Sequence, residues 1–268
     1  MKTFHYICGL PRSGSTLLTN ILAQNPTIHT TPTSGCHDVL FGIKNNWNAL
    51  IEHRASKELS DEANQKRVLR AALDAYHGTD KEIVIDKGRG WTSMMEMVEW
   101  LTDEKAKVLV PVRNVPQILA SLENLHRKHI ATRNHDGDYA NGQTTQARVQ
   151  QLLGNQSVFG LAFDRLRDAM LRGYGDRLHF VEFDDLTQTP ERKLQEIYDF
   201  LELPQFIHNF EKVERAHIED DTVHNMPDLH TTREAVRPVR DVSIATLGAE
   251  LVDTYSGTEF WRDQSPEH

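Results

Sequence analysis

A short segment near the start of the chain combines the residue types that hold phosphate groups. Residues 9–16 read Gly-Leu-Pro-Arg-Ser-Gly-Ser-Thr. Glycines let backbone N–H groups turn toward an anion, and Arg12 supplies a fixed positive charge inside the loop. Hydroxyl donors follow at Ser13, Ser15 and Thr16. We therefore predict a phosphate-binding loop, and the alternative is a glycine-containing turn with nothing bound.

The spacing of the glycines also narrows the class of ligand. Gly9 and Gly14 are spaced as in the P-loop of nucleotide triphosphatases, where a lysine follows the second glycine. That lysine neutralises the β- and γ-phosphates in those enzymes, and Ser15 takes its place here. A P-loop kinase acting on a small metabolite is therefore disfavoured. It remains an alternative, with Asp86 as its only candidate Mg²⁺ carboxylate, as does a nucleotide-binding module that has lost catalysis.

A second segment, about 100 residues later, could hold another phosphate. Residues 110–121 read Val-Pro-Val-Arg-Asn-Val-Pro-Gln-Ile-Leu-Ala-Ser, which predicts the end of a strand followed by a helix. Arg113 lies where the strand ends, and Ser121 lies just over one turn into the helix. A phosphate between them would gain a charge-assisted contact and a hydroxyl donor. The alternative is an arginine packed against a helix end and a serine on the helix surface.

The rest of the sequence predicts strands that alternate with helices. Short β-prone runs occupy residues 4–8, 83–85, 107–112 and 179–183. Apolar residues at helical spacing follow them, at residues 17–22, 94–101, 159–170 and 194–201. This alternation predicts one α/β domain of the P-loop type over residues 1–268, with a central parallel β-sheet covered by helices on both faces. Polar composition predicts a loop or lid near 126–145 and a C-terminal closing segment from about 217.

Both phosphate segments resemble the sulfotransferase family that uses 3′-phosphoadenosine-5′-phosphosulfate (PAPS). The family's 5′-phosphosulfate loop typically reads G-x-P-[RK]-[ST]-G-[ST]-[ST], and the Pro-Arg-Ser-Gly-Ser-Thr core here is similar to its tyrosylprotein and bacterial branches. The family's 3′-phosphate element is a strand followed by R-[ND]-P-x-[DE]-x-x-x-S. Here the proline comes one residue late, at Pro116, and Gln117 replaces the usual acidic residue. Further segments similar to the family cover most of residues 4–204.

The resemblance implies an enzyme that moves a sulfuryl group from PAPS to a hydroxyl or amine acceptor. Adenosine 3′,5′-bisphosphate would be the product, and no metal would be required. Donor contacts are implied for Pro11, Arg12, Ser13, Gly14, Ser15, Thr16, Arg113 and Ser121. In this family a late basic loop closes over the donor, which implies further contacts from Arg233 and Arg237. We expect the histidines of this segment near the acceptor, and the alternative is a solvated tail. The acceptor and the oligomeric state are not determined by the sequence.

Sulfuryl transfer needs a group that neutralises the leaving phosphate and a base that removes the acceptor's proton. Lys87 follows a predicted strand, as a lysine does in the tyrosylprotein branch, which implies contact with the bridging oxygen or the sulfuryl group. The alternative is a surface lysine at a strand end. That branch has a glutamate shortly after the first helix, which this chain lacks. His37, Asp38 and Asp86 are therefore the candidate bases, although Asp86 would point away from Lys87 if the strand persists.

The composition excludes some partners. The chain has 268 residues, 38% of them hydrophobic, and a formal net charge of −9, so we expect a core and no broad basic face for nucleic acid. Its two cysteines do not suggest a disulfide framework. The first apolar run is too short for a signal peptide, and no segment approaches the roughly 18 apolar residues of a membrane span. We expect a cytoplasmic protein without membrane contact, and the histidine-rich C-terminal segment lacks the spacing of a metal site.

Overall fold

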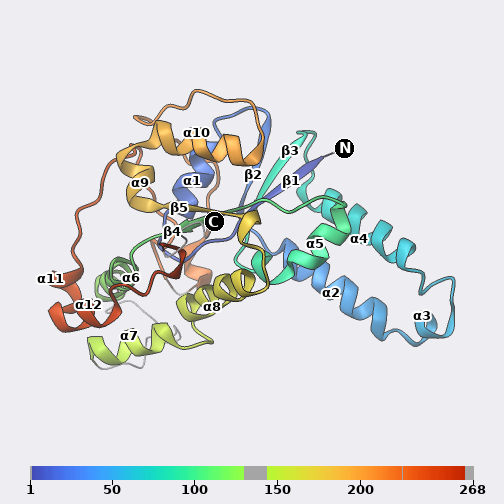
Figure 1. Ribbon diagram of the computed structural model, residues 1–268, viewed down its shortest axis with the longest axis horizontal. Helices are drawn as coiled ribbons and strands as arrows, with labels where there is room; N and C mark the ends of the chain where they lie inside the picture. The colour runs from blue at the N-terminus through green and yellow to red at the C-terminus, as the bar shows by residue number, and fades with distance from the viewer. Residues whose placement is uncertain (1, 130–143, 225, 263–268) are drawn as a thin grey trace, which may run out of the picture.

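Five short strands pair side by side and form a fully parallel β-sheet in the centre of the molecule (Figure 1). The computed structural model describes residues 2–129, 144–224 and 226–262. The strands within them are β1 (Thr3–Ile7), β2 (Ile28–Thr33), β3 (Ile83–Lys87), β4 (Val108–Val112) and β5 (Leu178–Glu182). Their order across the sheet is β2-β3-β1-β4-β5. Parallel pairing requires a crossover between each pair of strands, and helices supply it.

Helices cover both faces of this sheet (Figure 1). In chain order the α-helices are α1 (Ser15–Leu22), α2 (Cys36–Ala49), α3 (Ile51–Ala55), α4 (Glu62–His77), α5 (Met95–Thr102), α6 (Val115–His129), α7 (Thr145–Leu153), α8 (Val158–Leu171), α9 (Phe183–Gln188), α10 (Pro190–Leu201), α11 (Ser243–Leu247) and α12 (Ala249–Tyr255). Short 3₁₀ turns are η1 (Trp91–Met94), η2 (Gly175–Arg177), η3 (Asp221–His224) and η4 (Phe260–Arg262). In the described part of the chain, η3 is the only regular element between α10 and α11.

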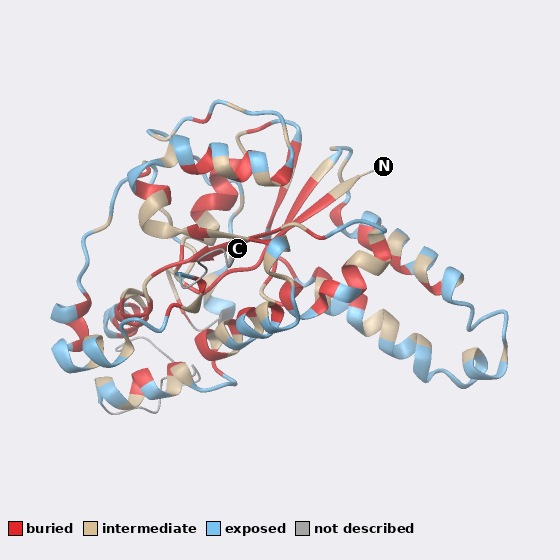
Figure 2. Ribbon diagram, in the orientation of Figure 1, coloured by how far each residue is buried: buried red, intermediate tan, exposed pale blue. Residues whose placement is uncertain are grey.

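The alternation of side chains along each strand divides the core between the two faces of the sheet. Tyr6, Val84 and Val110 point to one face and pack against apolar residues of α5, α6 and α8. Ile7 and Ile85 point to the other face, against apolar residues of α1 and α10. Figure 2 shows the strands as the buried centre of the molecule. Because both faces are covered, the carboxyl edge of the sheet is where a ligand can reach the ends of the strands.

The helices α2, α3 and α4 form an arm that extends away from the sheet (Figure 1). Much of its outer surface is exposed (Figure 2), including the apolar side chains of Phe41 and Ile51. The base of the arm is packed on the core through Leu40 and Leu73, which are buried. The start of α2 and the end of α4 therefore lie next to β3, close to the strand that carries Lys87.

The predicted fold class is confirmed, and four of the five strands lie where the sequence predicts them. The fifth, β2, was missed because Ile-His-Thr-Thr-Pro-Thr has no apolar run and carries a proline, which an edge strand tolerates. The ends of the segment predicted as a loop near 126–145 are helical, because α6 continues to His129 and α7 begins at Thr145. Residues 130–143 lie outside the described residues. Among the helices that are described, none is long and apolar enough to span a membrane.

Candidate active site

The predicted phosphate loop connects β1 to α1 through two positions with positive φ. Arg12 has φ 59° and Gly14 has φ 87°. A Cβ at Gly14 would lie 2.5 Å from Cδ2 of Phe183, so both the backbone angle and the space require glycine. A Cβ at Gly9 would lie 2.3 Å from the carbonyl oxygen of Pro111 in β4. These close approaches fix the loop against β4 and the start of α9.

Ser13 anchors the loop and does not face a ligand. Its hydroxyl lies 2.5 Å from the carbonyl oxygen of Leu10 and 2.7 Å from that of Pro111, and the side chain is buried. A hydroxyl has a single proton to donate, and these two carbonyls of the protein compete for it. Ser13 is also absent from the residues that line the pocket described below. Ser13, which the sequence predicts as a hydroxyl donor to the phosphate, therefore ties the loop to β4.

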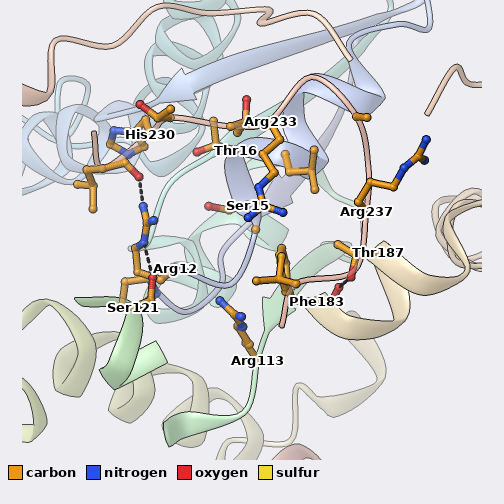
Figure 3. A pocket seen from close by; sticks show the side chains of 18 of the residues that line it. Arg12, Ser15, Thr16, Arg113, Ser121, Phe183, Thr187, His230, Arg233 and Arg237 are labelled. Atoms are coloured by element: carbon orange, nitrogen blue, oxygen red, sulfur yellow. Dashed lines mark hydrogen bonds between the residues drawn. The ribbon is translucent and has the colours of Figure 1, made fainter. Parts of the chain in front are cut away.

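Arg12 joins the two phosphate segments. Its Nε donates a hydrogen bond to Oγ of Ser121 in α6, over 3.1 Å. The same guanidinium donates to the carbonyl oxygen of Leu229 in the C-terminal segment (Figure 3). Three distant parts of the sequence therefore meet at one side chain, at the carboxyl edge of the sheet.

A pocket of about 260 Å³ opens over the phosphate loop (Figure 3). Its positive side chains are Arg12, Arg89, Arg113, Arg233 and Arg237. Hydroxyls and loop backbone come from Pro11, Gly14, Ser15, Thr16, Ser121, Thr187, Thr231 and Thr232. No acidic residue is among the described residues that line it. Because the whole chain carries a net charge of −9, this concentration of arginines marks the pocket as an anion site.

Arg113 is held in one orientation by two neutral partners. Its guanidinium carbon lies 4.5 Å from the centre of the Phe183 ring, and its Nε donates to Oε1 of Gln117 over 2.8 Å. The side chain is largely buried, with 8% of the residue exposed. These contacts orient the guanidinium, while the carboxylates of Asp184 and Asp241 act on it through longer-range electrostatics, so Arg113 can still contact an anion in the pocket.

The far wall of the pocket comes from residues 229–239 of the C-terminal segment. Figure 3 shows Arg233 reaching toward Ser15 of the phosphate loop. Arg237 is turned the other way, and its guanidinium forms an ion pair with the exposed carboxylate of Glu211. Of the two late arginines expected near the donor, Arg233 thus faces the loop and Arg237 is held at the rim.

Lys87 ends β3 beside the phosphate loop. Its Nζ lies 2.9 Å from Oε1 of Glu219 and 3.5 Å from Oγ1 of Thr16. Burial lowers the pKa of Lys87, and the carboxylate of Glu219 opposes that effect. The ammonium group therefore lies next to the anion pocket, paired with a carboxylate that the C-terminal segment supplies.

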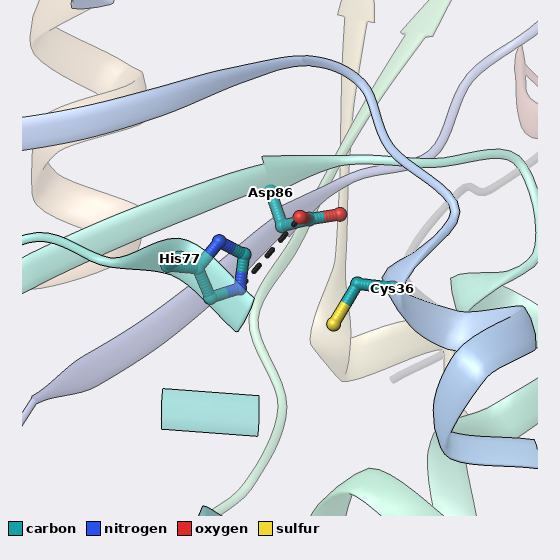
Figure 4. A group of neighbouring side chains, drawn as sticks. All are labelled: Cys36, His77 and Asp86. Atoms are coloured by element: carbon teal, nitrogen blue, oxygen red, sulfur yellow. Dashed lines mark ion pairs between the residues drawn. The ribbon is translucent and has the colours of Figure 1, made fainter. Parts of the chain in front are cut away.

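Asp86, one of the candidate bases, is on the other side of the sheet from Lys87. Its carboxylate accepts a hydrogen bond from Nε1 of Trp91 over 2.7 Å and lies near Cys36 and His77 (Figure 4). The residue is fully buried, and burial raises its pKa to about 6. Strand alternation, which separates Asp86 from Lys87, keeps this carboxylate out of the pocket.

The other two candidate bases lie at the start of α2, and neither lines the pocket. Nε2 of His37 is 3.4 Å from Oδ2 of Asp38, whose side chain is exposed. The His37 ring packs 5.7 Å from Trp91, and a Cβ at Gly90 would touch it at 1.9 Å. Burial lowers the pKa of His37. The structure therefore places His37 against the loop after β3, outside the ring of arginines.

Three charged residues around the pocket were missed by the sequence analysis, while His230 is one of the histidines of the C-terminal segment expected near the acceptor. Arg89 follows Lys87 by two positions, and its place after a strand end was the one signal available. Glu219 and Asp221 belong to a polar segment without periodicity, so no spacing distinguished them from a solvated tail. They reach the site because the C-terminal segment folds back over α1 and β2.

Comparisons with known proteins agree with this geometry. The sequence profile described as "Sulfotransferase family" matches residues 6–207, most of the chain. A mouse sulfotransferase solved in complex with PAP shares the fold at a TM-score of 0.55 and 14% identity, covering 96% of this chain and 85% of that one. The sulfotransferase domain of the Synechococcus PCC 7002 olefin synthase matches at a TM-score of 0.49 and 18% identity, covering 95% and 94%. No curated protein sequence is a significant match to the chain. The family profile, which spans both phosphate segments, shows that the chain belongs to the sulfotransferase family.

Proposed function

We propose that the protein transfers a sulfuryl group from PAPS to a hydroxyl or amine acceptor. The observation that carries the proposal is the pocket over the phosphate loop, which is lined by five arginines and by no described acidic residue. An acidic protein that places five arginines around one pocket has a site for a ligand with several negative charges.

The arrangement of the positive side chains fits a ligand with phosphate at both ends of an adenosine. The N-terminus of α1, together with Arg12, Ser15 and Thr16, suits the 5′-phosphosulfate, because helix N-termini and turned N–H groups bind anions. Arg113 and Ser121 suit the 3′-phosphate. Arg12 hydrogen-bonds Ser121, so the two phosphate sites share one wall.

Lys87 is our candidate for the group that assists bond breaking. Its Nζ is 3.5 Å from Oγ1 of Thr16, at the end of the phosphate loop where the sulfuryl end of the donor would lie. A positive charge there stabilises the charge that develops on the bridging oxygen as the S–O bond breaks. We also propose a cytoplasmic location, which the two free, buried cysteines support.

The test is a thermal-shift comparison of adenosine 3′,5′-bisphosphate with Mg-ATP and adenosine 5′-phosphate at equal concentration. We expect the bisphosphate to raise the Tm most, because a ligand at 100 times its Kd stabilises the native state by about 2.7 kcal/mol. A larger shift with Mg-ATP would support a P-loop kinase and contradict the proposal. Bisphosphate binding without release of bisphosphate from PAPS would identify a nucleotide-binding module without catalysis.

A further inference from the structure

The pocket contains a histidine–carboxylate pair that none of the sequence motifs includes. His230 lines the pocket, and its Nδ1 lies 2.5 Å from Oδ1 of Asp221. The second carboxylate oxygen, Oδ2, accepts the backbone N–H of His230 over 2.9 Å. The side chains are only 11% and 13% exposed. One carboxylate therefore fixes both the ring and the backbone of the same residue.

This contact determines which ring nitrogen of His230 carries the proton. An ionised carboxylate can only accept a hydrogen bond, so Nδ1 donates, and in the neutral ring Nε2 then keeps its lone pair. Nε2 lies 3.3 Å from Oγ1 of Thr33, at the end of β2, and 3.7 Å from Oε2 of Glu219. An aspartate on Nδ1 and a basic Nε2 toward the site is the division of roles found in the histidine–aspartate pair of serine hydrolases.

Glu219 connects this pair to the group proposed to act on the donor. Its Oε1 contacts Nζ of Lys87, and its Oε2 faces Nε2 of His230. The ammonium and the imidazole therefore lie on either side of one carboxylate, next to the phosphate loop. If the donor's sulfuryl group displaced the Glu219 carboxylate from Lys87, it would lie beside the imidazole of His230.

We propose that His230 is the general base of the transfer and that Asp221 is its positioning residue, an inference that rests on the proposed sulfotransferase function. The acceptor's oxygen or nitrogen forms a bond to sulfur, and Nε2 of His230 takes the proton from that oxygen or nitrogen. The bond from sulfur to the donor's bridging oxygen breaks. Its electron pair stays on that oxygen of the bisphosphate, where Lys87 supplies positive charge.

Burial favours a neutral His230 ring, against the pull of two neighbouring carboxylates. Asp221 and Glu219 face it from its own segment, and Lys87 faces it from β3, while Arg89 interacts electrostatically with Glu219. Burial has the largest effect and lowers the pKa of His230, and the two carboxylates oppose it. Turnover should therefore fall as the pH drops through the pKa of His230, because a protonated Nε2 cannot accept the acceptor's proton.

The experiment measures release of adenosine 3′,5′-bisphosphate from PAPS, with water as the acceptor, between pH 4.5 and 8.5. We expect His230→Gln to lower kcat about 10²–10⁴-fold, the range for loss of a general base, and to abolish the acid limb of the profile. Asp221→Asn should lower kcat and shift that limb. Bisphosphate binding by His230→Gln should stay within about threefold of wild type, because a neutral imidazole offers no charge to the phosphates.

The matched control is His217→Gln, the same substitution in the same segment. His217 contacts Oγ1 of Thr30. Like His230, it lies within electrostatic range of Lys87 and Glu219, so it tests the general effect of losing a histidine there. We expect a far smaller fall in kcat than in His230→Gln. Normal turnover and an intact acid limb in His230→Gln would overturn the proposal. If the wild-type protein did not bind the bisphosphate, that result would instead contradict the sulfotransferase function itself.

A second measurement does not depend on turnover. Nitrogen-15 NMR of the histidine rings should show His230 as the Nδ1–H tautomer at pH 7, with a pKa below 6.5, in wild-type protein bound to the bisphosphate. Asp221→Asn should lose that preference, and His217→Gln should keep it. An Nε2–H tautomer, or a protonated ring at pH 7, would leave no lone pair toward the site and would overturn the proposal.

Discussion

The two walls of the pocket hold their cations in different ways. On the wall of the phosphate loop, Arg12 donates to the neutral oxygens of Ser121 and Leu229, and Arg113 is held by Gln117 and the Phe183 ring. Across the pocket, carboxylates of the C-terminal half hold the cations: Glu219 pairs with Lys87 and Glu211 with Arg237.

This difference indicates how each wall would respond to an anionic donor. Because Gln117 and the Phe183 ring, which hold Arg113, are neutral, its charge is available to the ligand, and the first wall is ready to bind phosphate. A carboxylate partner must give way before Lys87 or Arg237 can contact an anion. We therefore expect the first wall to supply ground-state affinity, and the second to act when the donor displaces its carboxylates.

Among the cations of the two walls, the largest expected effect is at Lys87, beside the pocket. Lys87→Ala should lower kcat for bisphosphate release from PAPS about 10²–10³-fold, the scale for removing one stabilising donor, with little change in bisphosphate affinity. Lys87→Arg restores the positive charge and should recover part of the rate. The recovery should be incomplete, because a planar guanidinium cannot place its charge at the same point. Near-normal kcat in Lys87→Ala would move the electrophilic role to an arginine of the pocket.

A somewhat smaller effect is expected at Arg113, within the first wall. Arg113→Ala should weaken bisphosphate binding by roughly 1.5–3 kcal/mol, which is about 10- to 150-fold in Kd, as loss of a charge-assisted contact should. Isothermal titration would measure it, with adenosine 5′-phosphate as the ligand that lacks the 3′-phosphate. Arg172→Ala, directly after the end of α8 and paired with Glu96, is the matched control. Equal losses for both nucleotides would show that Arg113 does not contact the 3′-phosphate.

The first wall could be predicted from the sequence because its chemistry is local. The residues of the phosphate loop are contiguous, and the glycines, Arg12 and the hydroxyls follow a spacing that backbone geometry imposes. The pattern could not show which way each hydroxyl points, so Ser13 was expected to face the ligand and instead bonds to Leu10 and Pro111. Strand alternation did predict that Asp86 points away from Lys87.

The second wall could not be predicted because its contacts are distant in sequence and polar. Glu219 bonds to the backbone of Thr33 across 186 positions, and Leu229 accepts from Arg12 across 217. A segment with no periodicity gives no sign of such pairings, and the same composition is typical of a solvated tail. The arm of α2–α4 was missed for a related reason, since its exposed surface dilutes the apolar pattern.

The smallest expected effect tests whether the carboxylates of the second wall compete with the donor. Glu211 and Arg237 form an exposed ion pair at the rim of the pocket. In Glu211→Gln, Arg237 loses its carboxylate and is free to turn toward an anion. We expect bisphosphate binding to tighten about two- to fivefold at low salt, the range for one exposed pair, and the gain to vanish at high salt.

The control for Glu211→Gln is Glu214→Gln, which breaks the exposed pair with Lys212 and removes the same net charge. Lys212 does not line the pocket, so a gain in that variant would reflect only the general charge of the protein. In an Arg237→Ala background, Glu211→Gln should have no effect on affinity, because the arginine that it releases is absent. A gain that persisted in that background would exclude Arg237 as a donor contact. The second wall would then act on the donor through Lys87, Arg233 and His230.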